Sequence, residues 1–99
     1  MKYSFHPEAE EEFLQTIEYY EKCAANLGYD FALEVYSTIQ NVVQYPQAWP
    51  VLEKNIRRCQ TARFPYGIIY GIHEEEIFIL AVMHLHREPG YWKKRQLGS

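Results

Sequence analysis

Two histidines and an arginine follow a long apolar run near the end of the chain, and their side chains could carry acid–base chemistry. They are His84, His86 and Arg87. Imidazoles titrate near neutral pH, so the pair could take a proton from a 2′-hydroxyl and return one to a leaving oxygen, while the guanidinium stabilises a phosphorane-like transition state. A strand that stayed extended to Arg87 would place both histidines on one face and Arg87 on the other. The alternative is structural, with His84 packed at the core edge and Arg87 in a surface ion pair.

A second group of cations lies between residues 54 and 63, and it could bind phosphates or acidic side chains. It consists of Lys54, Arg57, Arg58 and Arg63. Nearby rings could stack on nucleic-acid bases, namely Tyr66, Tyr70, Tyr91 and Trp92. An acidic partner protein would use the same arginines, and ordinary solvated charge with core aromatics is the structural alternative. The pattern therefore predicts a binding face without deciding its ligand.

No metal site or cofactor is predicted. Only His73 and Cys59 could add ligands to the histidine pair, and neither has a diagnostic spacing. Cys23 and Cys59 lie far apart and form no paired-cysteine motif, so we expect both to be reduced.

Strands must position these residues, and two are strongly indicated. Residues 64–72 are rich in β-branched and aromatic types, residues 73–76 form a polar turn, and residues 77–83 are uninterruptedly apolar. A wholly apolar strand is expected to be interior and covered on both faces. The end of this strand places His84 and the residues after it at one edge of the sheet.

The elements before these strands read as scaffold. A short strand is predicted over residues 2–6. Two helices are predicted over about 7–27 and 29–45, with the break between them at Gly28. A loop is then expected over residues 51–55 and a strand over residues 56–62. The acidic run Glu8–Glu12 is expected to be a solvated helix face at the positive end of the helix dipole. Helices segregated from consecutive strands indicate an α+β fold, with a helical hairpin on a mainly antiparallel four-stranded sheet and a short C-terminal helix.

Length and composition agree with one small folded domain. We expect residues 1–95 to form it and residues 96–99 to be a loose tail. No run approaches the length of a membrane span, and the start of the chain lacks the apolar core of a signal peptide, so a cytoplasmic location is expected. The net charge of −3 argues against a protein that coats nucleic acid without sequence preference, although the clustered arginines permit one basic face.

The order of several loose motifs resembles the RelE/ParE toxin superfamily over nearly the whole chain. The matching segments are Phe5–Phe13, Ile17–Glu21, Pro46 with Trp49-Pro50, Ile56–Arg58, Arg63–Tyr66, Ile79–His84 and Arg87–Trp92. The resemblance implies the toxin half of a type II toxin–antitoxin, or plasmid stabilisation, module. It also implies an antitoxin partner that wraps around the helices and the sheet edge. RelE-like members cleave mRNA on the ribosome without a metal, whereas ParE-like members inhibit DNA gyrase.

This sequence departs from the ribonuclease pattern at two basic positions. Gly67 follows Tyr66 where RelE-like toxins tend to carry an arginine, and Leu85 stands where another is expected. Tyr91 matches the C-terminal Tyr of the ribonucleases, and Arg58 matches the first basic position on its strand. Losing charge stabilisation in a metal-free reaction costs rate.

The resemblance therefore favours ParE-like inhibition of DNA gyrase. It also allows for a toxin dimer or a higher complex of the toxin with its antitoxin. One alternative is a ribosome-dependent mRNA endonuclease that uses His84, His86, Arg87 and Tyr91 for catalysis. Another is an inactive member that only binds an antitoxin. Candidate contacts to the target or the antitoxin are Arg57, Arg58, Arg63, Tyr66 and Trp92.

Overall fold

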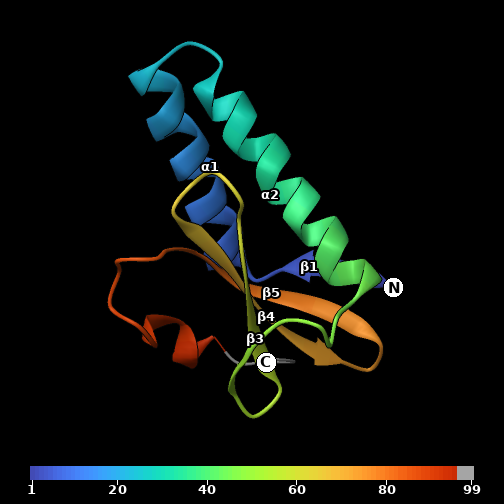
Figure 1. Ribbon diagram of the computed structural model, residues 1–99. Coiled ribbons are helices and arrows are strands. Elements are labelled where there is room, and N and C mark those ends of the chain that lie inside the picture. Colours follow the sequence, from blue (N-terminus) through green and yellow to red (C-terminus); the bar gives the residue numbers. More distant parts are fainter. Residues whose placement is uncertain (96–99) are drawn as a thin grey trace.

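The computed structural model describes residues 1–95, which form a helical hairpin packed on a five-stranded sheet (Figure 1). The elements are β1 Lys2–Phe5, α1 Pro7–Cys23, α2 Leu27–Gln44, β2 Val51–Glu53, β3 Ile56–Gln60, β4 Tyr66–His73, β5 Glu76–His84 and the 3-10 helix η1 Tyr91–Lys94. This order confirms the predicted α+β class and the short C-terminal helix. The loose tail predicted at residues 96–99 lies outside the described residues.

The first helix begins where the sequence predicts, because His6 caps its N-terminus and Pro7 is favoured in its first turn. Pro7 occupies the first turn, where its missing N–H costs nothing, and Nδ1 of His6 accepts a hydrogen bond of 3.1 Å from the Glu8 N–H.

The break between the helices lies at residues 24–26 and not at Gly28, which corrects the predicted boundary. Asn26 adopts a left-handed conformation, with φ 68°, and redirects the chain. Gly28 lies in the first turn of α2, where a Cβ atom would stand only 2.4 Å from the Ile17 carbonyl oxygen of α1. The glycine is therefore needed because the two helices approach closely here.

The sheet has the strand order β1-β5-β4-β3-β2. β1 pairs in parallel with β5, and the other neighbours are antiparallel. The fifth strand, β2, corrects the prediction of a loop over residues 51–55 and of a four-stranded sheet. It is only three residues long, too short for an alternating pattern to be recognised. Glu74 and Glu75, both with positive φ, form the predicted turn between β4 and β5.

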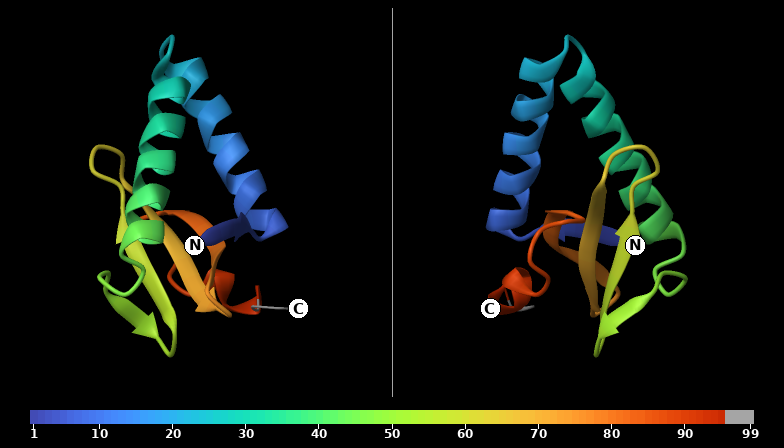
Figure 2. Two further views of the ribbon diagram at one scale, coloured as in Figure 1. Left: turned by 90° about the vertical axis from the view of Figure 1, so that its right-hand side faces the viewer. Right: turned by 60° about the vertical axis from the view of Figure 1, so that its left-hand side comes forward.

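The sheet is covered on both faces, as Figure 2 shows, by the helical hairpin on one side and the C-terminal segment on the other. The hairpin side holds the larger core, which includes Phe13, Phe31, Ile39, Ile68 and Tyr70. The opposite side holds a smaller core of Ile69, Leu80, Ala81, Met83 and Trp92. β5 lies between β1 and β4 and contributes to both cores, which confirms that it is interior.

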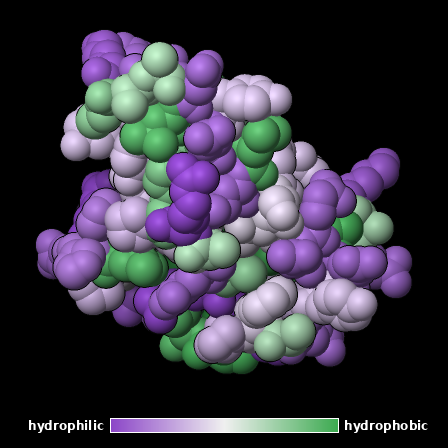
Figure 3. Space-filling model, turned by 45° about the horizontal axis from the view of Figure 1, so that its top comes forward, coloured by the Kyte–Doolittle hydropathy of each residue, from purple (hydrophilic) through white to green (hydrophobic). Residues whose placement is uncertain are grey.

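Large apolar side chains remain exposed on the outside of the hairpin. They include Leu14, Tyr19, Tyr29, Leu33 and Tyr36. In Figure 3 the hydrophobic patches on this side are separated by hydrophilic residues, so the exposed apolar surface is discontinuous. None of the helices within residues 1–95 has both the length and the apolar character that a membrane crossing requires.

Candidate functional site

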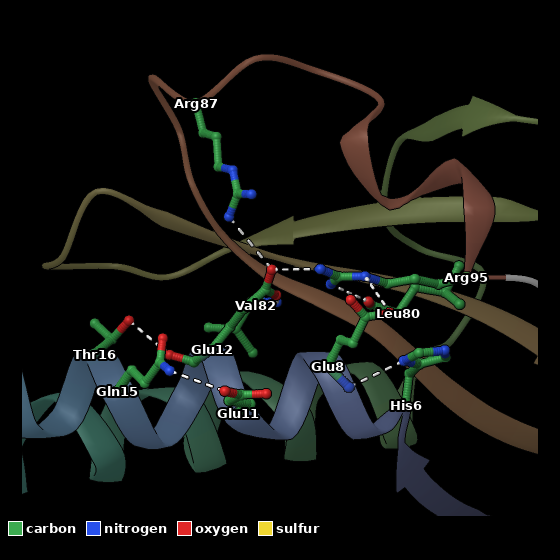
Figure 4. Close-up of polar contacts among 10 residues, drawn as sticks. All are labelled: His6, Glu8, Glu11, Glu12, Gln15, Thr16, Leu80, Val82, Arg87 and Arg95. Carbon is green, nitrogen blue, oxygen red and sulfur yellow. Dashed lines mark hydrogen bonds and ion pairs between the residues drawn. The ribbon is translucent and has the colours of Figure 1, made fainter.

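The carboxylate of Glu12 ties helix α1 to the sheet and to the C-terminal segment (Figure 4). Its Oε2 lies 2.8 Å from Nη2 of Arg95 and 3.5 Å from Nη1 of Arg87. Its Oε1 accepts a hydrogen bond of 3.1 Å from the Val82 N–H. Arg95 also donates to the Leu80 carbonyl at 3.0 Å. One buried ion pair therefore binds two backbone groups of β5.

These side chains take the place of a neighbouring strand. β1 pairs with β5 only as far as Phe5 and Ile79, after which the His6 N–H donates to the Ile79 carbonyl at 2.8 Å. Beyond that point the pairing of β5 with β4 is also irregular, since the register shifts between Ile69 and Tyr70. Backbone groups on a buried strand need partners, and Glu12 and Arg95 supply them for Val82 and Leu80.

Tyr91 lies between the two arginines that face Glu12. The guanidinium carbon of Arg87 is 3.5 Å from the centre of the Tyr91 ring, and that of Arg95 is 5.0 Å away. The Tyr91 hydroxyl is buried close to the Glu12 carboxylate. Burial raises the pKa of Tyr91 far above the ordinary phenol value, and the Glu12 carboxylate adds to this rise. The hydroxyl is thus held in its protonated form.

His84 is the last residue of β5, so the condition for a shared histidine face, a strand extended to Arg87, is not met. The chain turns after His84, and the Arg87 N–H donates to the His84 carbonyl at 3.0 Å. Nδ1 of His84 accepts a hydrogen bond of 3.0 Å from the His86 N–H, and the two rings are 5.4 Å apart. His84 also meets the Tyr66 ring edge-on at 5.1 Å, whereas His86 is exposed. Within residues 1–95, no cluster of three metal-ligating side chains is found.

Arg57 and Arg63, both predicted to bind a partner, lie apart from this cluster. Arg57 points to the hairpin side of the sheet and donates to the carbonyls of Gln47 at 3.1 Å and Trp49 at 2.7 Å, so its guanidinium holds the connection between α2 and β2. Arg63 lies on the exposed loop before β4 and pairs with Asp30 of α2 at 3.5 Å. These contacts are structural, and a role of either residue in binding remains a prediction.

Arg58 points to the opposite side of β3, as the alternation of the strand predicts, and lines a groove of about 370 Å³. The groove also includes Leu52, Glu53, Met83, Pro89, Trp92 and Lys93. Among the described residues, Arg58 makes no ion pair, whereas Lys93 pairs with Glu53 at 3.1 Å. Trp92, predicted to contact a partner, is only 3% exposed and mainly anchors η1 to the smaller core.

Residues 3–89 match the sequence model of a family described as the ParE toxin of the type II toxin–antitoxin system parDE. The chain belongs to the ParE toxin family. A solved structure described as a chromosomal ParDE TA system from P. aeruginosa has a similar fold, with a TM-score of 0.60 and 18% sequence identity. The match covers 87% of this chain and 97% of the other. No curated protein sequence matches.

In this ParE family member, Gly67 has a packing role beside Arg58. A Cβ atom on Gly67 would lie 3.1 Å from Cδ and 3.2 Å from Cγ of Arg58. The aliphatic part of Arg58 therefore covers the position where the ribonuclease pattern expects another arginine.

Glu12 and Arg95 are not among the site residues predicted from the sequence. The acidic run was expected to be solvated, which holds for Glu8, Glu10 and Glu11 but is wrong for Glu12, whose side chain is 14% exposed. Its position one helical turn after the buried Ala9 was the available signal, because it places Glu12 at the border of the apolar stripe. No local pattern marked Arg95.

Proposed function

We propose that this ParE family member is a toxin that arrests growth by binding and inhibiting DNA gyrase. The observation that supports this proposal best is that His84, Arg87 and Tyr91, three of the four residues considered for RNA cleavage, are engaged in contacts within the protein. Nδ1 of His84 is already occupied by the His86 N–H, and the Tyr91 hydroxyl is buried. Arg87 lies over the Tyr91 ring and faces Glu12.

RNA cleavage without a metal would need these groups to converge on one phosphate. A general base must come within hydrogen-bonding reach of the 2′-hydroxyl, and free cations must face the scissile phosphate. A buried tyrosine with a raised pKa is a poor proton carrier near neutral pH, since it neither meets solvent nor ionises. Inhibition through protein binding makes no such demand.

The family implies an antitoxin partner, and we place its contact on the helical hairpin. Leu14, Leu33 and Tyr36 are exposed there, and an amphipathic segment could bury them. Arg63, at the edge of α2, would meet acidic residues of that partner. Because gyrase acts on the chromosome, the proposal also locates the toxin in the cytoplasm.

Purified protein and DNA gyrase provide the direct test. We expect the chain to inhibit supercoiling of relaxed plasmid in proportion to its concentration, and to leave mRNA on programmed ribosomes uncut. New mRNA ends without any effect on gyrase would favour the endonuclease alternative. Activity in neither assay, with antitoxin binding retained, would identify a member that only binds its partner.

A further inference from the structure

The groove around Arg58 has a cation that no acidic group of the described chain neutralises. Arg58 is half-buried in β3, and the aliphatic part of its side chain packs against Gly67, so that the side chain lines the groove. An arginine held in this way loses little freedom when it binds a carboxylate through two parallel hydrogen bonds.

The remainder of the groove combines an apolar base with a second available cation. Met83 and Trp92 belong to the smaller core, and Leu52 stands at the rim with 39% exposure. Lys93 pairs with Glu53, but both side chains are exposed, and exposed ion pairs contribute little free energy. Lys93 can therefore turn toward an incoming anion. A volume of about 370 Å³ is enough for a few side chains.

The charge pattern around the groove favours an acidic peptide over a nucleic acid. Glu53 forms part of the groove and would repel a phosphate backbone, which needs several cations in a row. Base stacking requires open aromatic faces, yet Trp92 is 3% exposed and the guanidinium of Arg87 covers Tyr91. A single carboxylate next to an apolar side chain fits Arg58, which has no ion pair within residues 1–95, and the apolar base of the groove.

We infer that the Arg58 groove binds an acidic segment of the target protein, with a carboxylate on Arg58 and a neighbouring apolar side chain against Met83 and Trp92. This inference rests on the proposed function, which makes the target a protein. The antitoxin is expected to bind at the hairpin, on other elements of the fold.

The test compares the affinity of purified variants for DNA gyrase. Arg58→Gln should weaken binding by about tenfold to a hundredfold, the usual effect of losing a hydrogen-bonded charge pair. Lys22→Gln changes the net charge equally, but its ion pair with Glu18 lies on α1, so its affinity should stay within about twofold of wild type. Equal unfolding midpoints would show that the variants are folded.

A second pair of variants tests the groove without removing Arg58. Leu52→Glu places a negative charge at the rim and should weaken binding, whereas Leu52→Lys should preserve or strengthen it. The opposite signs separate an electrostatic effect from the loss of the leucine itself.

Three results would overturn the inference. If wild type binds gyrase and Arg58→Gln binds it equally well, the groove is not the contact and the proposed function stands. If wild type does not bind gyrase, the proposed function fails and the inference fails with it. If wild type instead binds a 12-nucleotide single-stranded RNA probe and Arg58→Gln does not, the groove is a nucleic-acid site.

Discussion

Glu12 connects the helical hairpin to the C-terminal segment through its ion pair with Arg95. Its carboxylate and the Arg95 guanidinium are 14% and 9% exposed, and each also bonds a backbone group of β5. Removing one member of a buried pair leaves the other charge without compensation, which costs more than the pair itself contributes.

Glu12→Gln should therefore lower the free energy of unfolding by about 3 kcal/mol. Glu11→Gln is the matched control, because Glu11 is exposed and its side chain accepts a hydrogen bond from Gln15, one turn along the helix. We expect the control to stay within about 0.5 kcal/mol of wild type. Urea unfolding measures both variants, and equal destabilisation by the two would show that Glu12 has no special role.

Tyr91→Phe distinguishes the structural role of this ring from a catalytic one. The change removes a buried hydroxyl that has no well-aligned hydrogen-bond partner within residues 1–95 and keeps the ring between Arg87 and Arg95. We expect the free energy of unfolding to rise by about 1 kcal/mol. Growth arrest should be unchanged when the variant is expressed.

Loss of growth arrest in a folded Tyr91→Phe protein would favour the ribonuclease alternative. Tyr91→Ala serves as the destabilised comparison, since it removes the ring from contact with both guanidinium groups. Thermal unfolding followed by circular dichroism separates loss of the fold from loss of activity.

The residues of this region could be recognised from the sequence by their chemical types, but their partners could not. Glu12 and Arg95 are 83 positions apart, and only the folded sheet brings them together. The opposite sides of Arg57 and Arg58 follow from the alternation of the strand. The turn after His84 depends on a hydrogen bond between the Leu85 N–H and the Pro65 carbonyl, a contact between two distant segments.

At the scale of elements, the helical hairpin depends on Gly28. In an isolated helix, Gly→Ala stabilises by about 1 kcal/mol. Here the added methyl group would collide with the Ile17 carbonyl, a backbone atom that cannot move without shifting α1. Helix propensity and packing thus predict opposite signs for the same substitution.

We expect packing to dominate, so that Gly28→Ala lowers the free energy of unfolding by at least about 1 kcal/mol. Gln40→Ala, at an exposed position of the same helix, should change it by no more than about 0.5 kcal/mol. Stabilisation by Gly28→Ala in thermal unfolding would mean that the helices can separate at this point without cost.

Most elements were predictable because their apolar periodicity is strong. The stripe of α1 and the apolar run of β5 correctly identify a helix and an interior strand. The errors lie where the signal is short or ambiguous. A helix-ending glycine and a close-packing glycine look alike in a sequence, so Gly28 was assigned to the wrong role, and the three residues of β2 carry no periodicity.

At the scale of the whole molecule, the two faces of the sheet have different partners. The hairpin covers one face and the C-terminal segment covers the other (Figure 2). The hairpin carries exposed apolar side chains, and the Arg58 groove lies on the side of the C-terminal segment. Two separate surfaces would let an antitoxin and a target contact the same small domain at different elements. The proposed division predicts that substitutions at Arg58 affect the target more than the antitoxin.

Pulse-labelling in cells shows whether this ParE family member blocks DNA gyrase, as proposed. DNA and protein synthesis are followed in the first minutes after the chain is induced without an antitoxin. We predict that thymidine incorporation falls first and that the DNA-damage response is induced, while methionine incorporation initially continues. An earlier collapse of protein synthesis, with new internal ends in cellular transcripts, would contradict the account.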